Sequence, residues 1–387
     1  MSTLDSHLEA ALARIGRAGQ RRTLRPATLL PGGRVERDGR MLLDFSSNDY
    51  LGLARHPLLA QRAGQWAAAH GAGTGASRLV TGTSERHLML EARIAAFKTC
   101  EAALLFASGW QANAAVIPAL LAAIPGTAVF TDRLIHASMH AGLAAAGARQ
   151  YRFRHNDLGH LEDLLAEKGA SAPARLILTE SVFSMDGDRA DMVRLAEIAE
   201  RHDAALFVDE AHATGVLGPQ GRGLTALVPG RVDVVMGTFS KALGSFGAYV
   251  AGSRALIDYL VNSASGFVFT TAPPPAVLGA IDAALDLVPD MEPQRAHLAR
   301  LSERLRSGLA RLGLEYGASS TQIVPAVIGP EDEAMDLSAR LEAAGFLASA
   351  IRPPTVPAGT SRLRLALRAG HTEEDVDVLL AAIETHR

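Results

Sequence analysis

Short apolar segments alternate with segments of helical length from about Leu58 to Leu260, and this alternation constrains the fold more than any other feature. Strands are predicted at Ala102–Ala107, Thr127–Thr131, Arg175–Glu180, Ala205–Asp209, Val232–Gly237 and Gly247–Ala251. Helices are predicted between them, among others at Gly109–Ala123, Ser138–Ala146, Leu158–Glu167 and Met192–His202. Strands that are apolar on both faces and separated by helices form a mostly parallel sheet covered by helices. The chain is therefore predicted to have an α/β fold.

The pattern changes after Pro273-Pro274-Pro275. Long helices are predicted at Pro275–Leu287 and Pro293–Leu312, followed by strands at Gln322–Ile328 and Arg362–Leu367. These elements predict a smaller C-terminal α+β domain, and the length of 387 residues also favours two lobes. We expect an N-terminal helix and arm over residues 1–45, a large domain over 46–275 and a small domain over 276–387.

Composition excludes several classes of function. The 38 basic and 41 acidic residues nearly balance, which argues against a nucleic-acid groove or a membrane-surface patch. The longest apolar stretch, Ala112–Phe130, contains Pro118, Pro125 and Gly126 and is too interrupted for a membrane span. Cys100 is the only cysteine, so no internal disulfide can form. We expect a cytoplasmic protein with no membrane or nucleic-acid partner.

Polar residues directly follow several predicted strands, where ligands collect in parallel sheets. Asp209 ends one strand in LFVDEAHATG, and Lys241 follows another in VVMGTFSKALG. In LLFASGWQAN, a strand leads through Ser108 and Gly109 into a helix, whose N-terminus suits a phosphate. Each feature also has a structural explanation, since aspartate often only caps a helix and glycine often only serves a turn.

The chain has only three lysines, and their contexts differ. Lys168 is an ordinary lysine near a helix C-terminus, and Lys98 is interpreted as a surface or edge residue. Lys241 lies among small residues between two apolar strands, where burial should lower its pKa. Three features together are typical of a pyridoxal 5′-phosphate (PLP) site: a lysine that can form a Schiff base, a carboxylate at a strand end, and a helix N-terminus that can bind the phosphate. His136 and His140 have no acidic partner pattern, so no metal site is predicted.

Eight blocks of the sequence resemble the α-oxoamine synthases in the order of that family: DFSSNDYLGLARHP, GTGASRLVTGTSERHLMLE, ASGWQAN, RLIHASMHAG, TESVFSMDGDRAD, VDEAHATGVLG, TFSKALGSFGAYVAG and IRPPTVPAGTSRLRLAL. Members of this family are PLP-dependent enzymes with the fold-type I transferase fold. They condense an amino acid with an acyl thioester and release CO2. The resemblance also implies a homodimer in which two subunits build each site.

Matching the motifs carries the cofactor roles onto this chain. The resemblance implies that Lys241 forms the Schiff base, Asp209 pairs with the ring nitrogen and His212 reaches the ring hydroxyl. His136 resembles the histidine that stacks over the ring, and with Lys241 and Asp209 it forms the predicted catalytic set. The remaining cofactor-binding residues implied are Gly109, Trp110, Ser184 and Thr238. Two positions depart from the family pattern, with Trp110 in place of phenylalanine or tyrosine and Ser181 in place of glycine.

The resemblance also implies substrate contacts. Arg364 matches the arginine that binds the amino-acid carboxylate. The planar guanidinium of an arginine can donate two parallel hydrogen bonds to a carboxylate. Thr355 and Arg22 match acyl-substrate contacts, although Arg21 and Arg25 lie close to Arg22, and Asn48 belongs to the site without a firm role.

Two blocks, TESVFSMDGD and IRPPTVPAGTSRLRL, are closest to the members that join L-alanine to a pimeloyl thioester, carried by CoA or acyl carrier protein, in biotin biosynthesis. The alternatives are a member that uses glycine with acetyl-CoA or succinyl-CoA, and a cofactor-free thioester-binding relative.

Overall fold

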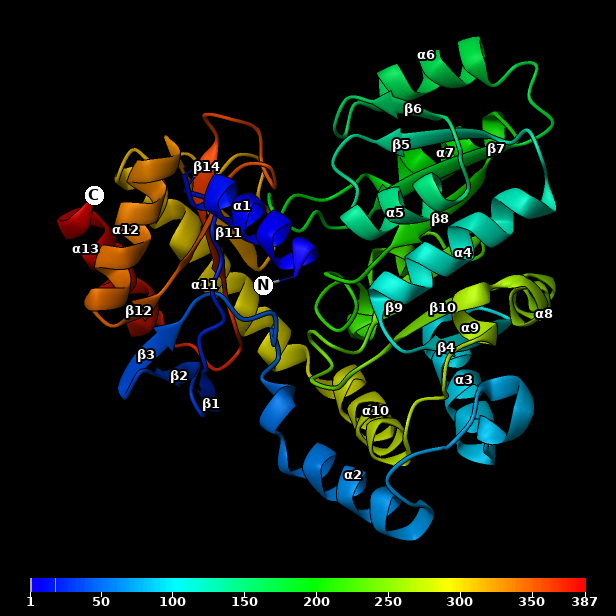
Figure 1. Ribbon diagram of the computed structural model, residues 1–387, viewed down its shortest axis with the longest axis horizontal. Helices are drawn as coiled ribbons and strands as arrows, with labels where there is room; N and C mark the ends of the chain where they lie inside the picture. Colours follow the sequence, from blue (N-terminus) through cyan, green and yellow to red (C-terminus); the bar gives the residue numbers. More distant parts are fainter. Residues whose placement is uncertain (1, 18) are drawn as a thin grey trace.

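The computed structural model describes residues 2–17 and 19–387 (Figure 1). The α-helices are α1 Thr3–Arg17, α2 Pro57–His70, α3 Glu85–Lys98, α4 Gly109–Ala123, α5 Ala137–Ala145, α6 Leu158–Lys168, α7 Met192–Arg201, α8 Arg254–Ser263, α9 Ser265–Val268, α10 Pro275–Leu287, α11 Glu292–Arg311, α12 Glu331–Ala343 and α13 Glu373–His386. The strands are β1 Thr28–Leu30, β2 Arg34–Arg37, β3 Arg40–Asp44, β4 Ala102–Phe106, β5 Ala128–Asp132, β6 Gln150–Phe153, β7 Arg175–Glu180, β8 Ala205–Asp209, β9 Val234–Thr238, β10 Ala248–Gly252, β11 Ile323–Gly329, β12 Phe346–Leu347, β13 Ser349–Ile351 and β14 Ser361–Ala366.

A seven-stranded sheet in the order β4-β10-β9-β8-β7-β5-β6 forms the centre of the larger part of the molecule. Strand β10 runs antiparallel to β4 and β9, and the other neighbouring strands pair in parallel, so the predicted mostly parallel sheet is confirmed. The six strands predicted for it match the structure to within two residues at each end. The seventh strand, β6, was missed because its residues at the sheet edge are only partly apolar and partly exposed.

Each face of this sheet packs into its own apolar core. Along β7, Ile177 belongs to one core and the next residue, Leu178, belongs to the other. Successive side chains of a strand point to opposite faces, so a strand covered on both sides must be apolar throughout. Helices α4 and α5 pack together on one of these faces, and α4 contacts β9 and β10.

The N-terminal and C-terminal segments share the smaller sheets. Strands β1, β2 and β3 form a sheet completed by β12, which pairs in parallel with β3, and β11, β14 and β13 form a second sheet. The predicted strands at Gln322–Ile328 and Arg362–Leu367 correspond to β11 and β14, whereas β1–β3 were not predicted. Helix α10 packs against α2 and α3, and the division of the chain into domains stays a prediction.

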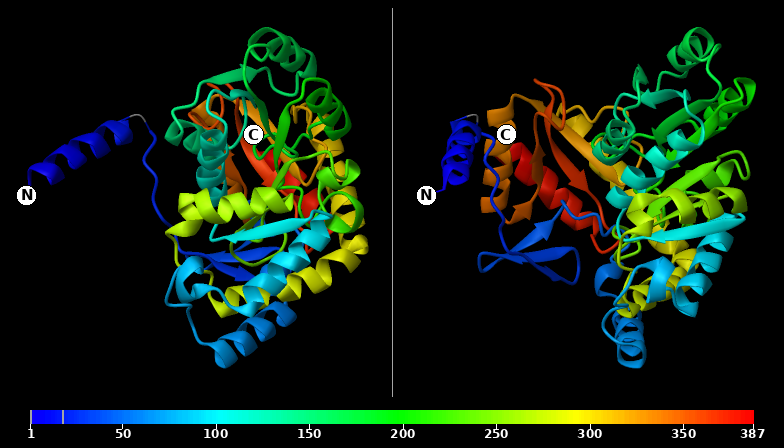
Figure 2. Two further views of the ribbon diagram at one scale, coloured as in Figure 1. Left: turned by 90° about the vertical axis from the view of Figure 1, so that its right-hand side faces the viewer. Right: turned by 45° about the vertical axis from the view of Figure 1, so that its right-hand side comes forward.

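The N-terminal helix α1 extends away from the body of the molecule, as Figure 2 shows, and none of its residues is buried. A membrane-spanning helix is absent from the part of the chain that the structure describes.

The prediction that Lys98 lies at the surface or an edge is wrong. Lys98 is 4% exposed at the end of α3, and its amine donates to the Glu210 carboxylate and to the Arg222 carbonyl. Burial alone would lower the pKa of Lys98, but the charge of Glu210, the neighbouring Tyr249 and the hydrogen bond to Glu210 together outweigh it and raise this pKa. Glu210 also accepts from the Thr225 amide at 2.8 Å and hydroxyl at 2.7 Å, so the pair joins α3 to two loops.

Replacing Lys98 by methionine should destabilise the protein by about 3–5 kcal/mol, because Glu210 would keep a buried charge without its partner. The double variant Lys98→Met/Glu210→Gln should recover most of that loss. Lys168→Met, which removes an exposed lysine, is the matched control and should change stability by less than about 0.5 kcal/mol. Urea unfolding measures all three, and equal losses for Lys98→Met and Lys168→Met would refute the assigned role of the pair.

Candidate active site

The carboxyl ends of β7, β8 and β9 lie side by side at one edge of the seven-stranded sheet. Glu180 at the end of β7 is paired in register with Asp209 at the end of β8, and Asp209 is paired with Met236 in β9. Asp209 is 4% exposed and accepts hydrogen bonds from Asn113 Nδ2 at 2.8 Å and from the Ala211 amide at 2.9 Å. Among the described residues it forms no ion pair, so it retains lone pairs for a further donor.

Lys241 and His212 form a close pair beside this edge, with 2.8 Å between Lys241 Nζ and His212 Nε2. Burial is the main cause that lowers the pKa of Lys241 to about 8, against the opposing charges of Asp209 and Glu180. This confirms the predicted direction. Burial, together with the charges of Lys241 and Arg364, holds the pKa of His212 well below its usual range. A neutral imidazole therefore faces an amine that exchanges its proton near neutral pH.

Arg364, on β14, reaches the same region from the C-terminal part of the chain. Its Nε donates to the Ser184 carbonyl at 2.6 Å, and its Nη2 donates to Asn48 Oδ1 at 3.1 Å. Arg364 is 6% exposed and forms no ion pair with another described residue. Its charge lowers the pKa of Lys241, which places the two cations within electrostatic range of each other. This arrangement suits a carboxylate ligand.

His136 is linked to Asp209 through two further side chains. His136 Nδ1 lies 2.7 Å from Ser138 Oγ, to which Asn113 Nδ2 donates at 3.0 Å while it also donates to Asp209. The Trp110 ring packs edge-on against the His136 ring, with 6.2 Å between the ring centroids. Trp110 itself is 54% exposed. Asp209, His136 and Trp110, which the sequence assigns to one site, are therefore connected through these contacts.

The predicted phosphate cradle lies where α4 begins. Gly109 is the first residue of α4, and the Ser108 side chain caps it by accepting from the Gln111 amide at 3.1 Å. At the end of β9, Thr238 Oγ1 donates to the Gly247 carbonyl at 2.8 Å and lies 2.8 Å from Ser240 Oγ. Main-chain amides at a helix N-terminus and nearby hydroxyls are suitable phosphate ligands.

Sequence reasoning missed several residues of the site, including Glu180. Burial and the neighbouring charge of Asp209 hold the pKa of the Glu180 carboxyl well above its usual value. Its position at a strand end, like that of Asp209, was the signal that could have revealed it. Ser181, the departure from the family pattern, is fully buried, and its Oγ has no hydrogen-bond partner in the described part of the chain.

His155 was also missed, and it holds the segment that carries Ser184. Its Nδ1 lies 3.0 Å from Asp132 Oδ1 and its Nε2 lies 2.8 Å from Asp188 Oδ2. Burial alone would lower the pKa of His155, but the hydrogen bonds to the two carboxylates outweigh it and raise this pKa to about 10. The Asp188 carbonyl accepts from the Phe183 amide at 3.1 Å, which closes the turn around Ser184.

Two predicted substrate contacts lie apart from this cluster. Arg22 and Thr355 are exposed, and no hydrogen bond joins either side chain to the cluster among residues 2–17 and 19–387. Arg25 instead pairs with Asp38 and Glu342. The segments that carry Arg22 and Thr355 are nevertheless in contact, because Arg352 donates to the Gly19 carbonyl at 2.6 Å.

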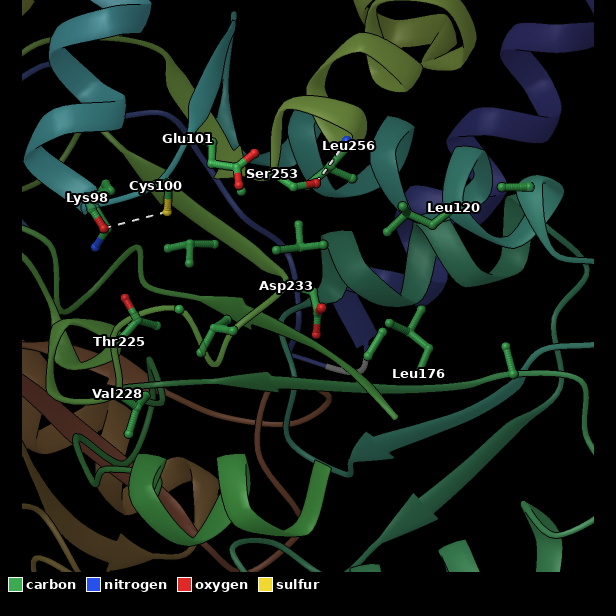
Figure 3. Close-up of a pocket in the computed structure, with 18 of the residues that line it drawn as sticks. Lys98, Cys100, Glu101, Leu120, Leu176, Thr225, Val228, Asp233, Ser253 and Leu256 are labelled. Carbon is green, nitrogen blue, oxygen red and sulfur yellow. Dashed lines mark hydrogen bonds between the residues drawn. The ribbon is translucent and has the colours of Figure 1, made fainter. Parts of the chain in front are cut away.

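A cavity of about 380 Å³ lies at the opposite edge of the sheet, where β7, β8 and β9 begin (Figure 3). Lys98 and Cys100 lie on one side of it, and Leu120 lies on the other. None of the predicted site residues lines this cavity in the described part of the chain. Because the titrating groups gather at the other edge, we place the candidate active site there.

Comparisons with known proteins agree with the fold. The family model for aminotransferase class I and II matches residues 40–383. A putative 8-amino-7-oxononanoate synthase of Bordetella bronchiseptica is 64% identical over 386 residues, which cover 99% of this chain and 97% of that protein.

Two solved structures extend the comparison. A serine palmitoyltransferase with PLP superposes with a TM-score of 0.91 at 27% identity and covers 100% of this chain and 98% of its own. An 8-amino-7-oxononanoate synthase of Francisella tularensis has a TM-score of 0.77 at 27% identity and covers 89% of this chain and 97% of its own. The fold-type I transferase fold is thereby confirmed.

The low pKa of Lys241 can be measured directly, because the chain has only three lysines. In the cofactor-free protein, acylation of Lys241 by acetic anhydride should rise with pH around a midpoint of about 8. Asp209→Asn should lower that midpoint, since the Asp209 charge raises this pKa. Mass spectrometry of the lysine peptides gives the rates, with exposed Lys168 as the internal reference. A Lys241 midpoint at or above that of Lys168 would contradict the assignment.

The His155 contacts predict a specific pH dependence of stability. The pKa of His155 is raised from 6.5 to about 10 on folding, so its stabilising effect is complete below pH 6.5 and is lost as pH rises towards 10. His155→Gln should therefore lower the free energy of unfolding by about 3 kcal/mol near pH 6.5 and by much less near pH 10. Urea unfolding across this range measures the difference, with His7→Gln on exposed α1 as control. A loss independent of pH would contradict a charged His155.

Proposed function

Since this chain belongs to the class I and II aminotransferase family, we propose that it uses pyridoxal 5′-phosphate to condense L-alanine with a pimeloyl thioester. The products are 8-amino-7-oxononanoate, CO2 and the free thiol of the carrier, which is CoA or acyl carrier protein. This reaction assigns the chain to biotin biosynthesis. The observation that carries the proposal is the convergence of Lys241, Asp209 and Arg364 at one edge of the sheet.

The residues present suit the cofactor. Asp209, buried and without an ion pair among the described residues, suits a protonated ring nitrogen. The N-terminus of α4 at Gly109 and the Thr238 hydroxyl suit the phosphate, and His212 suits the ring hydroxyl. His136 suits stacking over the ring. PLP bound at this site would withdraw electrons from the α-carbon of an amino acid that replaces Lys241 on the cofactor, which leaves the Lys241 amine free.

The side chains of the site then supply binding and proton transfer. Arg364 holds the carboxylate of alanine in a bidentate contact, with Asn48 beside it. Lys241, with a pKa of about 8, takes the α-proton of alanine and later returns a proton to the product carbon. Asp209 keeps the proton on the ring nitrogen by its negative charge, which stabilises the charge that develops in the transition state.

The acyl chain needs a second binding region, for which the N-terminal arm and the loop around Thr355 are suited. The hydrogen bond from Arg352 to the Gly19 carbonyl holds these segments against each other, and it supports a shared acyl channel that includes Arg22 and Thr355. We further propose that two copies of the chain assemble into a homodimer, as the family resemblance implies.

A competition assay tests the proposed substrates. Pimeloyl thioester with L-alanine should have a kcat/KM at least about tenfold higher than acetyl-CoA or succinyl-CoA with glycine, which corresponds to about 1.4 kcal/mol. The acyl chain should decide this preference, because one methyl group on the amino acid contributes only about 1–3 kcal/mol. Mass spectrometry identifies the products, and Lys241→Ala is the inactive control.

A second measurement checks the cofactor linkage. Borohydride should fix the cofactor to the Lys241 peptide, and attachment to Lys98 or Lys168 would contradict the site. Higher kcat/KM for succinyl-CoA or acetyl-CoA with glycine would overturn the proposed substrates but leave the roles of Lys241 and Asp209 intact. A protein that binds thioesters but no cofactor would overturn the proposed function entirely.

A further inference from the structure

Tyr50 connects the two halves of the site, although neither the sequence motifs nor the proposed chemistry gives it a role. Its side chain is fully buried, and its hydroxyl lies 2.7 Å from His212 Nδ1, 3.0 Å from Asn48 Oδ1 and 3.5 Å from Arg364 Nη2. The Asn48–Arg364 pair is the proposed carboxylate site, and His212 contacts Lys241. The Tyr50 hydroxyl is thus the shared link between carboxylate binding and the reactive amine.

We propose that Tyr50 is a positioning residue that couples occupation of the carboxylate site at Arg364 and Asn48 to the protonation of Lys241. The coupling runs through the His212 imidazole. This inference rests on the proposed function in one respect, because it takes the ligand of Arg364 to be a carboxylate.

The hydrogen-bond inventory of these groups allows only two arrangements. Arg364 can only donate, which fixes the oxygen of the Asn48 amide towards it. Tyr50 has a single hydroxyl hydrogen, and burial raises its pKa, so it stays neutral. The hydrogen therefore points either to Asn48 Oδ1 or to His212 Nδ1, since a neutral imidazole carries one hydrogen of its own.

Each arrangement favours a different state of Lys241. When Tyr50 donates to Asn48, His212 Nδ1 carries the imidazole hydrogen and donates to the Tyr50 oxygen. His212 Nε2 is then an acceptor, which stabilises a protonated Lys241. When Tyr50 donates to His212 Nδ1, His212 Nε2 carries the hydrogen and donates to Lys241, which must then be a neutral amine.

A bound carboxylate biases this choice. It accepts from Arg364 Nη2 in place of Asn48 Oδ1, and the freed Asn48 oxygen becomes a better acceptor for Tyr50. It also neutralises the Arg364 charge, which otherwise lowers the pKa of Lys241. Both effects increase the proton affinity of Lys241, so the amine becomes a stronger base when an amino acid occupies the site. The other groups that face Lys241 are Asp209, Glu180 and His136, and none of them contacts Tyr50 through a hydrogen bond in the described part of the chain.

The test uses propionate, a carboxylate without an amine, and the pH titration of the Lys241 amine in the cofactor-free protein, measured by its acylation with acetic anhydride. Propionate should raise the midpoint of the wild-type titration by about one pH unit, and this shift should fall to half or less in Tyr50→Phe. A hydrogen bond contributes an effect of that order to a pKa. Tyr249→Phe is the matched control, because Tyr249 is equally buried and its hydroxyl contacts Thr214 at 3.0 Å. It should retain the full wild-type shift.

Propionamide, which is uncharged, should produce no shift in any variant. If Tyr50→Phe does not fold, Asn48→Ser breaks the same link from the other side and should show the same reduced shift. An undiminished shift in Tyr50→Phe, or no shift in the wild type, overturns the coupling. Turnover of L-alanine with pimeloyl thioester by the wild type decides separately whether the proposed function stands.

Discussion

The register between β7, β8 and β9 is the constraint on which the site depends. Parallel pairing brings the ends of these strands to one edge, and Glu180 and Asp209 stand opposite each other there. Two adjacent buried carboxyls cannot both ionise at low cost, so one takes a proton and the other keeps its charge. Burial and the Asp209 charge hold the pKa of Glu180 well above its usual value, and Glu180 Oε1 has no hydrogen-bond partner among the described residues, whereas Asn113 and the Ala211 amide donate to Asp209. A shift of one residue would send one of the two side chains to the other face of the sheet.

The remaining charges of the site follow from that asymmetry. Lys241 loses hydration on burial, and the charge of Asp209 only partly compensates, so its pKa falls to about 8 and the amine is still mostly protonated at neutral pH. Arg364 adds a second positive charge without an internal partner in the described chain. The site therefore contains an excess of positive charge that only an anionic ligand removes. This is a physical reason for a cofactor phosphate and a substrate carboxylate to bind there together.

Sequence patterns predicted the regular parts of this molecule well because burial on both faces imposes continuous apolar runs. They singled out Asp209 and Lys241 because strand ends in parallel sheets are recognisable from spacing, whereas the role of His212 was implied by the family resemblance. They failed for β1–β3, where short exposed strands carry no such pattern, and for Lys98, whose partner Glu210 is distant in sequence. Tyr50 and His155 were missed for a related reason. A buried hydroxyl or imidazole gains its role from partners that only the folded chain brings near.

The pairing of β3 with β12 also bears on the order in which the protein is completed. Leu43 pairs with Phe346, and Asn48 meets Arg364 across 316 positions of sequence. Contacts at such separation form late, because the loop they close costs entropy before any contact compensates it. During synthesis the large sheet has all its strands well before β14 emerges from the ribosome. A nascent chain therefore has its Lys241 and Asp209 positions before it has any means to select an amino acid by its carboxylate.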